Sequence, residues 1–401
     1  MLVHKAYRYE LDPNNSQRTS LIQHAGVARF AYNWGLEQRI KMYREDAEKE
    51  KYTDSMKQHK LLNSIKKSQF PWMYECSKCA PQEALRDLDR AFRNFLRGLK
   101  TGKKVGFPRF KRKGANDSFR LTGAIRFKGR RIQLPRIGKV RIKERRKIYN
   151  KGRILSVTIR RRADKWFVSV TVEEEIPDPT PIIGKAIGVD LGISNLVTLS
   201  DGRTFANPRA LGKRLKKLRR LAKNLSRKTK GSKNRRKARI RLARLYLRVF
   251  NIRQDALHKL TTHLAKNHSK IVIEDLAVAG MLKNRRLARA IADVGMHEFR
   301  RKLVYKCKWY GSQLIIAHRT FPSSKRCSSC GHKKKQLALS EREYHCTMCG
   351  LRIDRDFNAA LNLVTVSLPE TLTACGEDVR RCDSSEIMTQ ASMKQEPNIG
   401  R

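Results

Sequence analysis

The 401-residue sequence lacks any apolar run close to the roughly 20 residues that a membrane-spanning helix requires. Its first residues, Met1 to Lys5, also lack the layout of a cleaved secretion signal. These absences predict a cytoplasmic protein without a membrane partner. In that compartment we expect the nine cysteines to be metal ligands or free thiols rather than a disulfide framework.

Acidic residues are scarce along the whole chain. There are 36 Asp and Glu against 90 Lys and Arg, which gives a formal net charge of +54 at pH 7. A surface of this charge attracts polyanions, and nucleic acid is the polyanion that the composition favours. With 40% hydrophobic residues, the chain is long enough for two to four domains and a sizeable core.

The segment from Lys213 to Arg253 contains no acidic residue at all. Leucines recur at helical spacing from Leu211 to Leu225, which predicts helices. Charge runs are often solvated faces, but self-repulsion along so long a stretch favours an RNA or heteroduplex partner. The candidate contacts are Lys213, Arg214, Lys216, Lys217, Arg219 and Arg220.

A second basic segment runs from Lys103 to Lys113 and contains Phe107 and Phe110. These two aromatic residues could stack on bases beside backbone contacts, or they could belong to the core. The candidate nucleic-acid contacts in this segment are Lys103, Lys104, Arg109 and Lys111.

Periodicity and turn signals divide the chain. Alternation over Leu2–Leu11 predicts a strand, and apolar residues at three- and four-residue steps predict helices from Gln17 to about Lys100. A strand-rich stretch from about Lys104 to Glu174 could form a small barrel with the first strand. Three prolines in segment 176–181 then predict a domain boundary.

Three carboxylates in the second half stand at the ends of predicted elements. Asp190 and Glu274 each follow an apolar strand, and Asp356 opens a helix. Such acids are often only turn residues, but a carboxylate after a buried strand is costly unless a cation or donor meets it. The order of elements predicts a nuclease in which the three acids converge at one end of a mixed sheet and hold two Mg²⁺ ions.

Two C-x2-C pairs precede the last of these acids. Their spacing suits a tetrahedral zinc shell, and turn-like contexts such as Cys-Gly-His favour a zinc ribbon over metal-free thiols. Another pair, Cys76 and Cys79, has no partner pair nearby, so we expect free thiols there. The predicted zinc ligands are Cys327, Cys330, Cys346 and Cys349.

Several motifs together resemble the TnpB family, the RNA-guided DNA endonucleases of insertion sequences, which are similar to type V CRISPR effectors. The resemblance rests on Gly188–Ile193, Ile273–Leu276 and Asp354–Ala360, and it extends over nearly the whole chain. Further segments typical of the family are Lys104–Lys111, Gln254–Leu260, Lys283–Ala288 and Phe321–Ser324.

The resemblance implies a multidomain α+β fold. It comprises an RNase H-like (RuvC) α/β nuclease domain with an inserted zinc ribbon, a β-barrel wedge domain and a helical recognition lobe. The implied ranges are 1–11 and 102–178 for the wedge, 12–101 for the recognition domain, 183–325 and 352–366 for RuvC, and 326–351 for the ribbon. We expect 367–401 to be a disordered tail, because it is polar and has few large apolar residues.

By the same resemblance, Asp190, Glu274 and Asp356 are the catalytic acids. The implied cofactors are two Mg²⁺ ions, one Zn²⁺ ion and a guide (omega) RNA derived from the transposon end. This RNA selects double-stranded target DNA by base pairing in a bacterial or archaeal cell, and a separate transposase encoded by the same element moves the DNA. A short motif beside the target would be read by Tyr52, Lys78 and Gln82, unless these are ordinary surface residues.

Other interpretations remain open from the sequence. The chain could be a guided repressor that does not cleave, although the intact set of acids argues against this. It could be a transposase that catalyses strand transfer, although no Tyr or Ser recombination motif stands out. The ribbon could hold the helix that begins near Asp356 or help load DNA, and Asp275 and Asp354 could tune the metals or support the loops.

Overall fold

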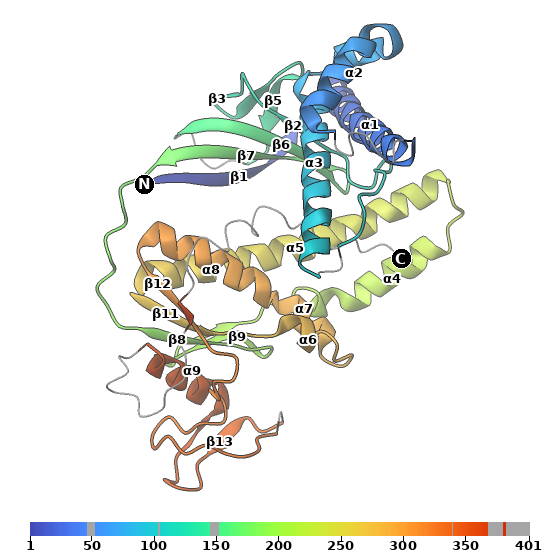
Figure 1. Ribbon diagram of the computed structural model, residues 1–401. Coiled ribbons are helices and arrows are strands. Elements are labelled where there is room, and N and C mark those ends of the chain that lie inside the picture. The colour runs from blue at the N-terminus through green and yellow to red at the C-terminus, as the bar shows by residue number, and fades with distance from the viewer. Residues whose placement is uncertain (46–52, 103–104, 145–151, 339, 368–379, 382–401) are drawn as a thin grey trace. The chain divides into compact units, whose positions relative to one another are not determined.

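The computed structural model describes residues 1–45, 53–102, 105–144, 152–338, 340–367 and 380–381 (Figure 1). The chain divides into two compact units, Met1–Pro177 and Asp178–Arg401, and the division lies within the proline-rich segment 176–181. Each unit has its own hydrophobic core. No helix among these described residues is both long and apolar enough to cross a membrane.

The first unit contains a seven-stranded antiparallel sheet with the order β2-β6-β7-β1-β5-β4-β3. Strand β1 lies in its middle because it pairs with β7 along its length, from Leu2 opposite Glu175 to Leu11 opposite Trp166. Its strands come from the two ranges predicted for the wedge, about 1–11 and 102–178. Its strands are β1 (Leu2–Asp12), β2 (Ser118–Leu121), β3 (Arg126–Lys128), β4 (Arg131–Leu134), β5 (Gly138–Ile142), β6 (Arg153–Arg162) and β7 (Lys165–Glu175).

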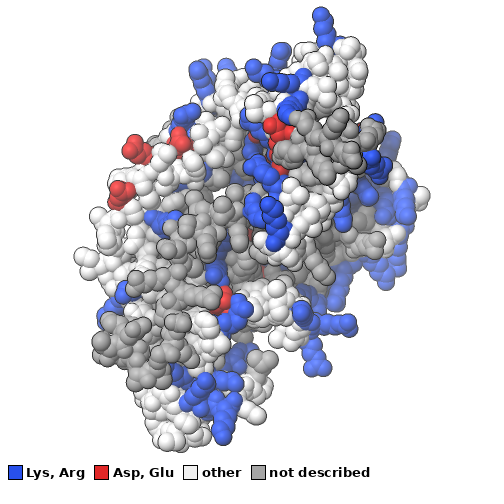
Figure 2. Space-filling view, in the orientation of Figure 1, with Lys and Arg blue, Asp and Glu red and all other residues white. Residues whose placement is uncertain are grey.

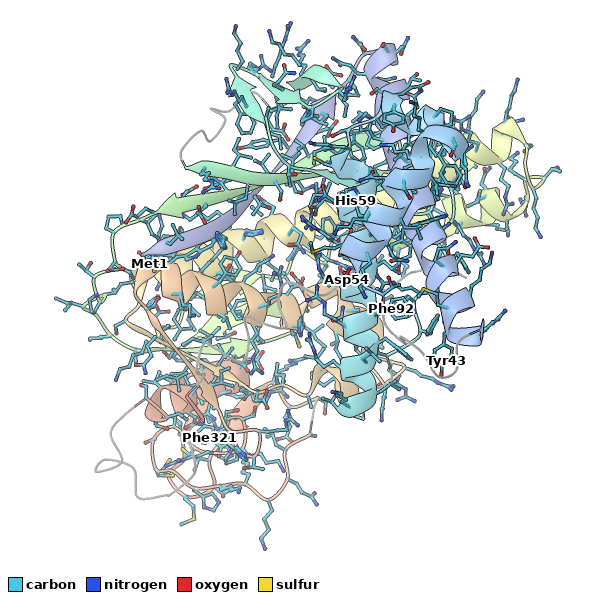
Figure 3. All side chains as sticks on the ribbon, turned by 45° about the horizontal axis from the view of Figure 1, so that its top comes forward. Met1, Tyr43, Asp54, His59, Phe92 and Phe321 are labelled. Atoms are coloured by element: carbon cyan, nitrogen blue, oxygen red, sulfur yellow. The ribbon has the colours of Figure 1, made fainter. Side chains whose placement is uncertain are left out.

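The predicted helical region packs on this sheet through one shared core. Asp54 caps α2 by accepting the N–H of Lys57 at 2.7 Å (Figure 3). Cys76 is buried and Cys79 is partly buried, and neither forms a disulfide with another described cysteine. The elements are α1 (Asn15–Glu45), α2 (Ser55–Gln69), the 3₁₀ helix η1 (Pro71–Glu75) and α3 (Cys79–Lys100).

The second unit is built on a six-stranded mixed sheet with the order β10-β9-β8-β11-β12-β15. Strands β8, β11 and β12 are parallel, and β9 and β10 form an antiparallel hairpin. Within the expected tail, Arg380 and Arg381 form β15 beside β12, whereas 368–379 and 382–401 lie outside the described residues. The other strands are β8 (Ile187–Leu191), β9 (Asn195–Leu199), β10 (Thr204–Ala206), β11 (Lys270–Glu274) and β12 (Gln313–Ala317).

Helices cover both faces of this mixed sheet (Figure 1). In β11, Ile271 and Ile273 join a core with α5 (Lys233–Asn267) and α8 (Met296–Tyr310). Val272 points to the opposite face, where it packs with Leu363 of α9 (Arg355–Thr365). Phe321 contacts the edge of this smaller cluster (Figure 3). Alternate residues of the buried strands therefore pack against the helices on opposite faces of the sheet.

Shorter elements complete the second unit. Asp293 accepts hydrogen bonds from the N–H groups of Leu211 and Gly212 and from the guanidinium of Arg253, so it contacts both ends of the basic segment. The remaining elements are η2 (Gly212–Arg214), α4 (Leu215–Ser226), α6 (Val278–Met281), α7 (Ala288–Val294), β13 (Glu343–His345) and β14 (Arg352–Asp354).

Helix α9 lies against the backbone of β8. A Cβ atom at Gly188 would collide with the carbonyl oxygen of Ala360 and would also lie 3.1 Å from the Cβ of Leu363. Glycine is required here because the helix and the strand approach more closely than a side chain permits. The small side chains of Ala359 and Ala360 serve the same approach, since both are buried.

Replacing Gly188 by Ala should therefore force α9 away from β8. We expect the second unit to lose about 1–3 kcal/mol of unfolding free energy, as is usual for overpacking. Denaturant unfolding of Gly188→Ala checks this, with Gly184→Ala as the matched control because a Cβ at Gly184 meets nothing within 4 Å. Equal effects of the two substitutions would contradict the packing argument.

Candidate active site

Asp190 and Glu274 lie at the carboxyl ends of neighbouring parallel strands. The ladder between β8 and β11 pairs Val189 with Ile273, so the two acids occupy the next position on each strand. Because Val189 and Ile273 face the core with α5, alternation turns both acids toward the α9 side of the sheet. Ligands of open α/β sheets bind at this carboxyl edge.

Asp356 joins them from the first turn of α9. Its Oδ2 atom lies 3.8 Å from the position of a Cβ on Gly192, directly after the end of β8. The charges of Glu274 and Asp356 both act on Asp190. The structure thus brings the three predicted acids together, although they come from separate parts of the chain.

Burial dominates the electrostatics of this cluster. It raises the pKa of Asp190 well above the usual range, and the neighbouring charges of Glu274 and Asp356 raise it further. Burial also raises the pKa of Glu274, although a hydrogen bond from the Ser323 hydroxyl opposes this shift. Clustered carboxylates of this kind are costly without a cation, and their oxygen donors suit Mg²⁺.

Two further acids have structural roles. Burial acts to raise the pKa of Asp275, but hydrogen bonds from Arg300 and Arg319, at 2.6 and 2.7 Å, lower it overall. Asp354 caps α9 by accepting the N–H of Phe357 at 2.9 Å. These partners favour the interpretation that both acids support loops.

The four cysteines form a compact cluster in the ribbon. Their Sγ atoms all lie within 4.8 Å of one another, with Cys327 to Cys349 at 3.6 Å and Cys330 to Cys346 at 3.5 Å. Zn–S bonds of about 2.3 Å in a tetrahedron place sulfur atoms about 3.8 Å apart, so the cluster fits a zinc ion. Backbone N–H groups of Cys349 and Met348 lower the pKa of Cys346 to about 6, which favours the thiolate ligand.

The carboxylates are spread more widely than the cysteines. Within the part of the chain that the structure describes, only the cysteine cluster has three or more such donor atoms within 4.8 Å of one another. Asp356 also accepts hydrogen bonds from the Arg355 guanidinium at 3.3 Å. The carboxylate oxygens therefore line a site that is wider than the cysteine cluster, and the Arg355 guanidinium partly neutralises the charge of Asp356.

The predicted nucleic-acid contacts in the first unit differ in their exposure. Lys78 is exposed at the N-cap of α3, and Gln82 is partly buried in its first turn. Arg109 is exposed, whereas the Lys111 ammonium lies 3.8 Å from the Tyr32 ring centre and its pKa is lowered by burial. Tyr52, Lys103 and Lys104 lie outside the described residues.

Phe107 and Phe110 are about half exposed, at 47% and 52%. Phe107 packs edge-to-face with Phe92 and Phe95, each with ring centres 5.4 Å apart. Phe107 thus packs against α3 on one side and meets solvent on the other.

The predicted basic helix is α4, which buries Leu218 and presents cations around it. This amphipathic arrangement leaves the predicted contact residues accessible to a polyanion. Five of them are exposed and Arg214 is partly buried; the exposed ones are Lys213, Lys216, Lys217, Arg219 and Arg220.

A cationic face on the sheet of the first unit was not predicted from the sequence. Lys128, Arg131 and Arg141 are direct cross-strand neighbours on β3, β4 and β5. Together with Arg130, they surround a hollow of about 280 Å³. The opposite face buries apolar residues, so the missed signal was strict alternation in three short strands. Lys and Arg also outnumber Asp and Glu on the face in Figure 2.

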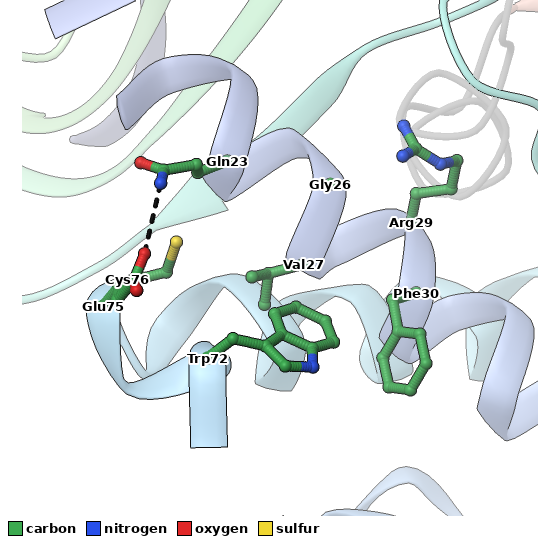
Figure 4. Close-up of a pocket in the computed structure, with 8 residues that line it drawn as sticks. All are labelled: Gln23, Gly26, Val27, Arg29, Phe30, Trp72, Glu75 and Cys76. Atoms are coloured by element: carbon green, nitrogen blue, oxygen red, sulfur yellow. Dashed lines mark hydrogen bonds between the residues drawn. The ribbon is translucent and has the colours of Figure 1, made fainter. Parts of the chain in front are cut away.

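A pocket of about 400 Å³ lies between α1 and η1 (Figure 4). Trp72, 43% exposed, contacts Phe30 edge-to-face there, and Gln23 donates a hydrogen bond to Glu75 at 3.1 Å. None of the residues that the sequence predicted for catalysis or binding lines this pocket. It is mixed apolar and polar, and it lies in the first unit, whereas the carboxylates belong to the second.

The fold and the two clusters define an RNase H-like nuclease fold of the RuvC type with an inserted zinc ribbon. Its solved counterparts include a structure described as the Cas12f1-sgRNA-target DNA complex, which it matches with a TM-score of 0.54 at 15% identity. The match covers 87% of this chain and 82% of that one, and it concerns the fold.

The chain belongs to the TnpB family. It is 37% identical to a protein of Streptomyces pristinaespiralis described as "Putative RNA-guided DNA endonuclease", over 98% of this chain and 96% of that one. It is 34% identical to InsQ of Escherichia coli K12, described in the same words, over 94% and 95%. Shorter stretches match "TnpB-like" proteins of Acanthamoeba polyphaga mimivirus at 32% identity over 34% of this chain and 27% of each of theirs.

Three family models match parts of the chain. Residues 167–285 match a model described as "Probable transposase", and 297–363 match the TNB domain of Cas12f1-like proteins. Residues 1–48 match a model described as a helix-turn-helix domain. In the structure this last region is β1 followed by the single 31-residue helix α1 up to Glu45.

The raised pKa of Asp190 predicts a conflict between stability and function. Folding favours the protonated carboxyl, so the metal-free protein loses stability as the pH rises from about 4 through the raised pKa. Asp190→Asn removes this loss and should raise the thermal midpoint, by an amount that grows with pH and then levels off. Thermal unfolding in chelator measures this effect. Asp255→Asn is the control, because it removes an exposed acid that pairs with Lys259. The prediction is contradicted if Asp190→Asn does not raise the thermal midpoint near pH 8.

Proposed function

We propose that this protein is an RNA-guided DNA endonuclease that makes double-strand breaks in DNA complementary to its guide RNA. The observation that carries the proposal is the convergence of Asp190, Glu274 and Asp356 at the carboxyl edge of the sheet, in a chain whose full-length relatives bear that name. The clustered acids support a hydrolytic site, because uncompensated carboxylates in one place require a cation.

In this proposal the three acids hold two Mg²⁺ ions. Such ions, when bound, activate a water molecule and stabilise the leaving 3′ oxygen of the phosphodiester. The residues of the chain orient the ligands: Ser323 donates to Glu274, and Arg355 donates to Asp356 at 3.3 Å. The raised pKa values mean that the acids bind cations best when the pH is high enough to ionise them.

Guide RNA and double-stranded target DNA are the proposed partners. Base pairing would supply sequence selection, so the protein needs only cationic surfaces and a reader of a short flanking motif. The exposed cations of α4 support the first requirement. We assign the second to Lys78 and Gln82 beside the start of α3, together with Tyr52, and we propose that a separate transposase performs transposition.

A guided repressor and a strand-transfer transposase are the competing functions. The intact acids disfavour the repressor, and the description of one family model favours the transposase. The three functions differ in their products. A repressor leaves the target intact, a transposase joins DNA ends, and an endonuclease releases free ends.

The decisive experiment is plasmid cleavage by protein that is co-expressed with RNA from its own locus. The target carries randomised flanking bases, and the reaction contains Mg²⁺ or chelator. We expect guide-dependent double-strand cuts that are lost in Asp190→Ala and retained in Asp255→Ala, which changes an exposed acid paired with Lys259. Binding without cuts would indicate the repressor, and joined ends would indicate the transposase.

The cationic face of β3–β5 predicts a second measurable effect. Like charges directly opposite each other destabilise a sheet, so the row of Lys128, Arg131 and Arg141 favours a polyanion, although Arg141 also lies 3.9 Å from Asp12 on β1. Arg131→Gln with Arg141→Gln should weaken guide-RNA binding roughly ten- to thirtyfold near 0.15 M salt. The slope of log affinity against log salt should fall by about two, which filter binding over a salt series measures.

The matched control is Lys60→Gln with Lys67→Gln, which removes two exposed cations from α2 in the same unit. If attraction depended only on net charge, both pairs would weaken binding equally. Loss of target-DNA binding by the RNA-loaded complex, with unchanged RNA binding, would assign the face to DNA instead.

A further inference from the structure

The helix that carries Asp356 is joined to the cysteine ribbon by two buried asparagines. The Asn358 side chain accepts the N–H of Ser328 at 3.0 Å and donates to the carbonyl of Arg326 at 2.7 Å. These two groups flank Cys327, so one amide holds the backbone on both sides of a predicted zinc ligand. Asn358 is fully buried, at 0% exposure.

Asn362 repeats this arrangement one turn later in α9. Its amide donates to the carbonyls of Arg326 at 2.6 Å and of Ser323 at 2.8 Å, and it is only 1% exposed. Ser323 in turn donates its hydroxyl to Glu274. The segment 323–328 therefore contacts the helix of one predicted catalytic acid and the side chain of another.

The buried side-chain amides of Asn358 and Asn362 need hydrogen-bond partners in fixed directions. A buried amide that lost its partners would carry a desolvation penalty, so the segment has one favourable position against α9. The other buried residues of this helix face, such as Ala359, Ala360 and Leu363, are apolar. An apolar side chain at position 358 or 362 would also bury surface area. The amides differ because their hydrogen bonds fix the position of segment 323–328 relative to α9.

We propose that Asn358, Asn362 and Ser323 are positioning residues through which the metal-loaded cysteine cluster holds Asp356 and Glu274 in place for cleavage. This inference rests on the proposed endonuclease function and concerns the choice between two roles for the ribbon. A closed thiolate shell fixes Cys327 and its neighbouring peptide groups, and the amides transmit that position to α9. The ribbon thereby acts on the cleavage step, and target loading does not depend on these contacts.

The test compares cleavage and binding in the full-length protein loaded with guide RNA. Asn358→Ala and Asn362→Ala should slow cleavage of saturating target roughly ten- to a hundredfold, as is usual when outer partners of a metal ligand are lost. Guide-dependent binding of the target, measured without added Mg²⁺, should stay within about twofold of wild type. Ser312→Ala is the control. It also removes a hydrogen bond from a serine, to the Ala265 carbonyl, but it lies at the start of β12, away from the carboxyl edge that carries the acids.

Two measurements without activity separate positioning from general damage. Release of zinc to a chromogenic chelator should accelerate in Asn358→Ala and not in Ser312→Ala. Hydrogen exchange of the α9 amides should rise both in Asn358→Ala and in Cys349→Ser. If the cluster acts through Asn358, the two substitutions combined should slow cleavage no more than the stronger one alone.

Several outcomes would overturn the inference. Parallel loss of target binding and cleavage would assign the ribbon to DNA loading, and additive effects would separate the cluster from Asn358. Should the asparagine variants fail to fold, Ser323→Ala gives the test with a smaller change, since it should retain zinc and target binding while cleavage slows. If the wild-type protein does not cleave at all, the proposed function fails, whereas zinc release and exchange still report on the link.

Discussion

The close backbone contact between β8 and α9 is the constraint on which the candidate active site depends. Asp190 and Asp356 come from distant parts of the chain, and they meet because Gly188 has no side chain to separate the strand from the helix. The same contact places Asn358 and Asn362 against segment 323–328. One glycine therefore determines both where the acids lie and how the ribbon reaches them.

Carboxylates cluster at the edge of the second sheet, and cations line up across β3–β5. Each cluster favours a ligand of the opposite charge. At the edge of the second sheet, burial raises the pKa values of Asp190 and Glu274, and the charges of Glu274 and Asp356 raise that of Asp190 further, an effect that a cation would relieve. The row of cations across β3–β5 has the opposite sign, and a polyanion would relieve it. Repulsion that the folded chain retains is best explained by ligands that offset it, and the two signs match metal ions and a nucleic acid.

Long periodic segments and ligand spacings were predictable from the sequence, because their signals are local. The strands before Asp190 and Glu274 are apolar and buried on both faces, and the cysteine spacing closes into a compact cluster. Features that depend on distant neighbours were not predictable. The contact of the Lys111 ammonium with the ring of Tyr32 in α1 is an example, because no local pattern links these two residues.

The β3–β5 face was missed for a related reason. Its three strands have only three to five residues each, which is too few for alternation to stand out among many surface cations. The burial of the two asparagines was not predictable either, since Asn in a helix usually marks an exposed or capping position. Only the packing of α9 reveals that both amides point inward.

The small size of the ribbon explains why its contacts with α9 are polar. Its own buried cluster consists of Cys327, Tyr344 and Cys346, with only a few partly buried neighbours. So little apolar area cannot fix the orientation of a neighbouring helix, because hydrophobic contact is not directional. A metal shell and paired amides supply direction instead, and the Tyr344 hydroxyl adds to them by donating to the Lys325 carbonyl at 3.2 Å. In the proposed arrangement, a ribbon of this size positions the helix of Asp356 only when its thiolates are closed around a metal.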